Sequence, residues 1–117
     1  MLVECTRFKV KEGQSSKVDE WLQFLNDHIP DVLVTLENEK MYVETIFRER
    51  TMQGEEYLYW YSVRGEGGMD VEDSEHWIDK QHLAYWDECI NKSYHPVDLE
   101  TAVVMIPAKI QQVMVQK

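Results

Sequence analysis

Apolar and polar positions follow two different periods along the first third of the chain. Residues 2–10 alternate between the two kinds of side chain, which predicts a β-strand. From Val18 to Leu36 the apolar positions recur at the spacing of about 3.6 residues that is typical of an amphipathic helix. Pro30 falls inside this pattern and has no backbone N–H to donate, so we expect the helix to be kinked or broken there.

Two further strands are predicted over residues 40–50 and 55–64, where β-branched and aromatic side chains are concentrated. The short link between them contains Gly54, which suits an antiparallel hairpin. These two segments therefore form adjacent strands of one sheet in our prediction.

A second helix is expected to begin at Asp70 or Ser74 and to run to about Asn91. A last strand is expected over residues 99–106, because Pro107 follows an apolar run there. The predicted order of elements is strand, helix, strand, strand, helix, strand.

Two split β-α-β units in this order predict an α+β fold, a ferredoxin-like sandwich with a four-stranded antiparallel sheet and two helices on one face. Large apolar side chains occur on both faces of the predicted strands, so the second face also needs a cover. A second copy related by a two-fold axis supplies one, which predicts a homodimer. We expect a single domain over residues 1–117, with residues 106–117 as a C-terminal extension that packs on the dimer.

The formal net charge is −10, from 12 basic and 22 acidic residues. This charge repels nucleic acids and anionic membrane surfaces, so neither partner is expected. Cys5 and Cys89 lie far apart without a CxxC pattern, which is typical of free thiols in a reducing compartment. The first residues lack the basic and apolar regions of a signal peptide, so a cytoplasmic location is expected.

His82, near the middle of the apolar face of the second predicted helix, is the strongest candidate for chemistry. Glu75 and Asp79 are expected on the same side of that helix, within two turns. A carboxylate so placed can orient an imidazole and raise its pKa, so that His82 and Glu75 form a catalytic pair acting as a general base. The alternative is a core histidine with a satisfied hydrogen bond, with Glu75 at a solvated mouth.

His76, Asp79 and His82 recur at intervals of three and suggest a metal site at first sight. Side chains at these positions turn around the helix and do not converge easily. The chain also has no HExxH motif or cysteine cluster, so no metal site is expected. We expect His76 and Asp79 to contact a substrate instead.

Aromatic side chains are the remaining candidates for substrate binding. Tyr57, Tyr59 and Tyr61 share one face of a predicted strand, whereas Leu58 and Trp60 share the other. Trp86 lies on the apolar face of the second helix. Tyr59, Tyr61 and Trp86 can line a pocket, in which the tyrosine hydroxyls offer hydrogen bonds. The tyrosine row can also form a half-buried sheet face or a contact between subunits.

The order of elements, the length and the aromatic strands resemble the dimeric α+β barrel superfamily over residues 2–106. That superfamily includes antibiotic-biosynthesis-monooxygenase-like proteins, haem-degrading enzymes and stress-responsive barrel proteins. The run from Glu66 to Lys80, with its glycine pair and its segment EDSEHWIDK, is similar to a small bacterial family of uncharacterised proteins.

The superfamily resemblance implies a barrel made from the sheets of two subunits, with a pocket between the sheet and helices of each subunit. It also implies a possible monooxygenase-like activity that needs no cofactor. Haem-degrading members use a set of Asn, Trp and His, whereas Thr6 and Arg7 stand in the matching region of the first strand here. No haem or other cofactor is therefore expected.

Two functions remain open, and the sequence does not decide whether the chain is an enzyme. The first is a homodimeric protein that binds or transforms a small, largely apolar organic molecule, with His82 and Glu75 as the polar groups of its pocket. The second is a non-catalytic dimeric interaction module, whose acidic exterior docks a basic protein partner.

Overall fold

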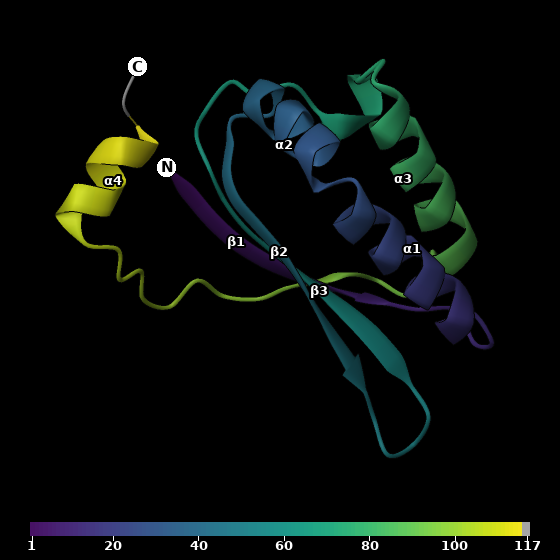
Figure 1. Ribbon diagram of the computed structural model, residues 1–117. Helices are drawn as coiled ribbons and strands as arrows, with labels where there is room; N and C mark the ends of the chain where they lie inside the picture. Colours follow the sequence, from purple (N-terminus) through teal and green to yellow (C-terminus); the bar gives the residue numbers. More distant parts are fainter. Residues whose placement is uncertain (116–117) are drawn as a thin grey trace.

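Three long strands and one short strand form an antiparallel sheet in the computed structural model, which describes residues 1–115 (Figure 1). The strands are β1 (Leu2–Lys9), β2 (Met41–Arg50), β3 (Glu56–Arg64) and β4 (Val97–Asp98). Their order across the sheet is β2-β3-β1-β4, and each neighbouring pair is antiparallel. This order, with helices between the strands, confirms the ferredoxin-like α+β sandwich.

Three α-helices cover one face of the sheet, and a fourth lies apart from them (Figure 1). The helices are α1 (Ser15–Asp27), α2 (Ile29–Asn38), α3 (Trp77–Cys89) and α4 (Ala108–Met114), with a short 3₁₀ turn η1 (Val71–Asp73) before α3. The predicted break is confirmed, since α1 ends before His28 and Pro30 lies in the first turn of α2. Proline fits in the first turn although it has no backbone N–H, because the first N–H groups of a helix have no hydrogen-bond partner within it.

The register of the sheet decides which side chains face the helices. Trp60 is opposite Thr6 and Ile46, whereas Tyr61 is opposite Cys5 and Thr45. Because side chains alternate along a strand, the first set lies on the inner face and the second on the outer face. The predicted separation of the tyrosine row from Leu58 and Trp60 is therefore confirmed.

Trp21 is the centre of the core between α1, α3 and the sheet. Its side chain is 0% exposed, and its ring lies within 6.4 Å of the rings of Trp60, Tyr85 and Trp86. The buried cluster around it consists of Val10, Val18, Leu58, Tyr85, Cys89 and Ile90. This packing fixes α3 against the sheet and with it the side chains that α3 presents.

The expected last strand over residues 99–106 is wrong. Pairing with β1 ends after Asp98, apart from a bond from the Leu99 N–H to the Cys5 carbonyl and one from the Thr101 hydroxyl to the Val3 carbonyl. The chain then leaves the sheet toward α4, which lies near the N-terminus (Figure 1). An apolar run forms a strand only where it pairs with a neighbouring strand, and within residues 1–115 no strand pairs with this run beyond Thr101.

The start of the second predicted helix also differs from the expectation. Residues 71–73 form the 3₁₀ turn, and α3 begins only at Trp77. The imidazole Nδ1 of His76 accepts a hydrogen bond from the Ile78 N–H and so caps this helix. Within residues 1–115, no helix is long and apolar enough to cross a membrane.

Arg48 joins β2 to α1 and β3, so we expect Arg48→Lys to lower the free energy of unfolding by about 1.5 kcal/mol. Its guanidinium donates to the nearly buried Glu56 carboxylate at 2.7 Å and to the Ser15 carbonyl at 2.9 Å, and it also pairs with Asp19. A lysine ammonium cannot span these acceptors at once. Urea denaturation measures the change, and an equal loss in Arg50→Lys, at a more exposed position, would contradict this role.

Candidate functional site

A cavity of about 850 Å³ lies between the inner face of the sheet and the helices. Its apolar lining includes Phe8, Leu25, Val32, Ile46, Trp60 and Trp86. Its polar lining includes Thr6, Glu39, Glu44, Ser62, Asp79 and His82. The combination of aromatic rings with a few convergent polar groups is typical of a small-molecule site.

Helix α3 supplies three neighbouring side chains of this lining, Asp79, His82 and Trp86. Their spacing of three and four residues places them on one side of the helix. Phe8 and Trp60 of the sheet lie opposite, with ring centres 4.6 Å and 5.1 Å from that of Trp86. The aromatic part of the cavity is therefore continuous with its polar part.

His82 is a neutral hydrogen-bond donor in this cavity. Its Nδ1 accepts a hydrogen bond from the Trp21 indole N–H at 3.0 Å, so the proton of the neutral ring lies on Nε2. Burial lowers the His82 pKa to about 4, and the nearby Asp79 only partly opposes this shift. The sequence singled out His82 but not Trp21, whose regular apolar spacing indicates only a core residue.

Asp79 is the most unusual polar group of the cavity. The residue is 6% exposed, and its Oδ2 atom has no hydrogen-bond partner among the described residues. Buried polar atoms in proteins are nearly always paired, so an unpaired one requires a reason. This unpaired oxygen distinguishes Asp79 from the other polar groups of the lining.

Glu39 and Glu44 bring two further carboxyl groups to the cavity. Burial raises the Glu39 pKa, and the neighbouring carboxyls of Glu44, Asp79 and Glu72 raise it further, to about 7. Burial also raises the Glu44 pKa, with a contribution from Asp79, although a hydrogen bond from Trp60 opposes the shift. Glu39, Glu44 and Asp79 all line this cavity, so their carboxyl groups share one partly buried environment.

These two glutamates were missed as site residues by sequence reasoning. Arg48, four residues further along β2, binds Glu56 and Asp19 and not Glu44. Alternation along β2 places Glu44 on the same face as Ile46, but it does not tell that this face meets the helices. Glu39 lies at the end of α2 and carries no comparable signal.

The expected pairing of Glu75 with His82 is not formed. Glu75 precedes α3, so helical spacing does not apply to it. Its side chain is 89% exposed and lies 3.1 Å from the Lys80 ammonium. Asp79, rather than Glu75, is the carboxyl group beside His82.

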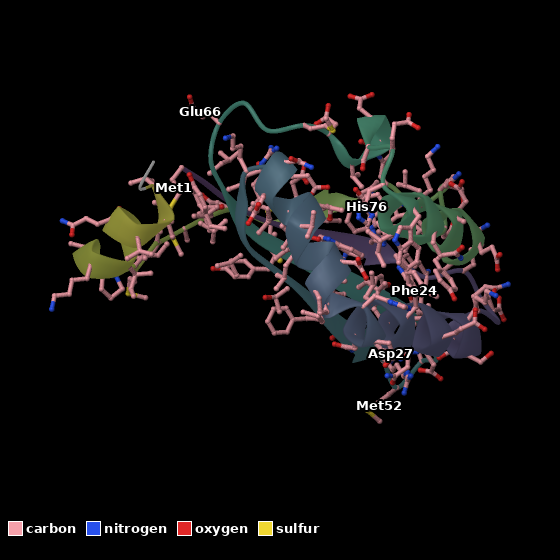
Figure 2. All side chains as sticks on the ribbon, turned by 45° about the horizontal axis from the view of Figure 1, so that its top comes forward. Met1, Phe24, Asp27, Met52, Glu66 and His76 are labelled. Atoms are coloured by element: carbon pink, nitrogen blue, oxygen red, sulfur yellow. The ribbon has the colours of Figure 1, made fainter. Side chains whose placement is uncertain are left out.

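Tyr59, Tyr61 and His76 also lie outside the lining of this cavity. The two tyrosines are on the outer face of the sheet, where the Tyr59 hydroxyl donates to Glu49 at 2.6 Å. His76 lies at the beginning of α3, where its ring caps the helix (Figure 2). Trp86, Asp79 and His82 are thus the predicted site residues that the structure brings together.

Metal ligation was not expected from the sequence. Among residues 1–115, no group of three or more His, Cys, Asp or Glu side chains is arranged to hold a metal ion.

The fold and the cavity define an α+β protein of the ferredoxin-like type with a partly open cavity between its sheet and helices. Residues 1–112 match a family of unknown function, DUF6176, and the chain belongs to this family. The crystal structure of L-rhamnose mutarotase from Formosa agariphila is similar, with a TM-score of 0.58 and 19% sequence identity, over 91% of this chain and 100% of that chain. A comparison with curated proteins finds no match.

The raised pKa of Glu39 predicts a distinct pH dependence of stability. Folding raises this pKa from 4.5 to about 7, so the stabilisation is complete below 4.5 and is lost as the pH rises through 7. Relative to wild type, Glu39→Gln should therefore gain stability over that window, on the order of 1 kcal/mol because the group is partly exposed. His82 acts in the opposite direction, because its folded pKa is lowered to about 4.

Urea denaturation of wild type and of Glu39→Gln across this pH range measures the difference between their free energies of unfolding. The contribution of His82 cancels in this difference, because both proteins contain it. Glu37→Gln on the exposed side of α2 is the matched control and should show no such change. A constant difference between wild type and Glu39→Gln at all pH values would contradict the placement of Glu39 beside the other carboxyl groups.

Proposed function

We propose that this protein binds a small organic molecule in the cavity and transfers protons to and from it through Asp79 and His82. The observation that carries the proposal is the buried Asp79 oxygen without a partner, beside a neutral imidazole whose tautomer is fixed by Trp21. The Asp79 carboxyl group accepts a hydrogen bond and the Nε2–H group of His82 donates one, as a general acid–base pair requires.

Several features support an organic ligand of modest size. The rings of Phe8, Trp60 and Trp86 offer apolar surfaces for the body of the ligand. The carboxyl groups accept hydrogen bonds from its polar part. The ligand is then largely apolar, as expected from the sequence, but with at least one strong hydrogen-bond donor.

The similar structure is described as an L-rhamnose mutarotase, so this fold accommodates an enzyme named for a small organic substrate. The superfamily resemblance also suggests monooxygenase-like chemistry without a cofactor. The acid–base pair favours proton transfer over oxygenation, because it serves the first reaction directly.

A thermal-shift screen of small sugars, alcohols, amines and acids tests this function. At least one compound should stabilise the wild type, and nuclear magnetic resonance should then show that the protein accelerates its proton exchange or isomer interconversion. The acceleration should be lost in His82→Gln and retained in the surface variant Glu75→Gln. Stabilisation and acceleration that survive in both Asp79→Asn and His82→Gln would overturn the proposal.

We further propose that a second copy of the chain covers the outer face of the sheet. Phe47 is 56% exposed on that face, and Val103 and Met105 beyond β4 are 71% and 85% exposed. The cations Arg7 and Lys9 also lie on the outer face, so a basic partner is disfavoured there. A two-fold copy would bury these apolar groups and would place the C-terminal segment against its partner.

This dimer predicts that Phe47→Asp converts the protein to a monomer in sedimentation velocity experiments, because a charge would be buried in the interface. Met52→Asp is the matched control, since Met52 lies fully exposed at the tip of the β2–β3 hairpin (Figure 2). A wild type that sediments as a monomer, or a dimer that survives Phe47→Asp, would contradict the interface.

Docking of a basic protein is the second candidate function, and the net charge of −10 is the observation that favours it. In that case the cavity would have no ligand, and the exposed acidic surface would carry the activity. The free thiols of Cys5 and Cys89 support a reducing, cytoplasmic compartment in either case.

A further inference from the structure

The cavity has an excess of negative charge in its lining. Of its cations, Arg64 donates to Glu4 at 3.1 Å, and Lys92 lies 2.7 Å from Asp87. Neither pair includes the interacting carboxyl groups Glu39, Glu44 and Asp79. Within the described residues, no salt bridge is formed by any of these three acids.

A second and independent observation is the Oδ2 atom of Asp79, which has no hydrogen-bond partner among the described residues. The residue is 94% removed from solvent, so bulk water does not satisfy this oxygen in the way it satisfies a surface carboxylate. A buried acceptor of this kind is strongly destabilising unless a donor reaches it. Aromatic rings line the same cavity, and their faces attract cations.

We propose that the ligand of this cavity is a small organic amine, whose ammonium group lies among Glu39, Glu44 and Asp79 and whose apolar body packs on Trp60 and Trp86. The inference rests on the proposed function, because it names the ligand class of the same site. An ammonium group has three N–H donors for the carboxyl oxygens, and its positive charge offsets their negative charge.

Other ligand classes fit less well. A neutral polyhydroxylated molecule can donate hydrogen bonds to the three carboxyl groups, but it leaves their mutual repulsion in place. An organic acid adds to that repulsion. A purely apolar molecule leaves Asp79 without a partner.

Isothermal titration calorimetry with 2-phenylethylamine and 2-phenylethanol compares the two chemistries on one apolar body. The amine should bind wild type at least about tenfold more tightly than the alcohol. Glu44→Gln should lower the affinity for the amine about tenfold and leave that for the alcohol unchanged, whereas Glu75→Gln should alter neither. Glu39→Gln provides a second variant should Glu44→Gln unfold.

Proton release gives a further readout of the same complex. An ammonium beside Glu39 favours the carboxylate form, so binding should release protons near the pH at which Glu39 titrates, about 7. Glu44 of β2, Asp79 of α3 and Glu72 of η1 face Glu39 and oppose its ionisation in the empty site. Titrations in buffers of different ionisation enthalpy measure the release, which Glu39→Gln should reduce.

Two results overturn the amine inference. One is equal or tighter binding of 2-phenylethanol or L-rhamnose, and the other is no binding of the amine up to about 10 mM. In the first case the cavity remains a small-molecule site and the proposed function stands. A different result would show that the proposed function fails: no compound of any class would bind in a manner that depends on Asp79.

Discussion

Replacing Asp79 with asparagine is expected to weaken ligand binding about a hundredfold and, at the same time, to stabilise the empty protein by about 1 kcal/mol. Binding is lost because the carboxyl group that accepts hydrogen bonds from the ligand is replaced by an amide. Stability is gained because a buried carboxyl oxygen without a partner weakens the fold, and an amide at this position can donate to neighbouring carboxyl groups.

The two effects are measured separately, by urea denaturation of the ligand-free protein and by titration with the compound that stabilises wild type most. Asp87→Asn is the matched control, because Asp87 also lines the cavity but is paired with Lys92 at 2.7 Å. The Asp87→Asn variant should have a slightly lower free energy of unfolding than wild type and should bind the same compound with unchanged affinity. If Asp79→Asn loses stability and keeps its affinity, Asp79 has a structural role instead.

Trp21→Ala should have the largest effect on stability, a loss of about 4 kcal/mol in the free energy of unfolding. The side chain is fully buried against Trp60, Tyr85 and Trp86, and it holds the His82 ring through a hydrogen bond of 3.0 Å. Its removal leaves a cavity in the core and frees the imidazole. For a domain of this size such a loss is a large part of the total stability.

Urea denaturation followed by circular dichroism measures this loss. Trp77→Ala is the control, since Trp77 is half-exposed at the first position of α3 and should cost about 1 kcal/mol. Similar losses for the two substitutions would show that Trp21 is not the centre of the core.

The fold was predictable because its elements carry strong local patterns. The apolar spacing from Val18 to Leu36 predicted helices on one surface, and Pro30 predicted the break between them. Alternation predicted that Tyr59 and Trp60 lie on opposite faces of the sheet. Alternation alone does not tell which face meets the helices, so it left open whether Tyr59 and Tyr61 line a pocket or lie on the outer face.

The site was only partly predictable, because it depends on where helices begin and on register. Asp79, His82 and Trp86 lie on one side of α3, and the periodicity was sufficient to find them. Glu75 was misplaced because the His76 cap starts the helix later than the pattern suggested. Alternation puts Glu44 on the face of Ile46, but no local signal tells that this face meets the helices.

Native mass spectrometry of the protein as purified, without added ligand, tests most directly whether the cavity binds a small molecule through Asp79. Wild type and Glu75→Gln should carry a reproducible small-molecule mass, and Asp79→Asn should carry no such mass. The same bound mass on Asp79→Asn as on wild type would contradict this prediction, because the ligand would then be held without the carboxyl group on which the site is built.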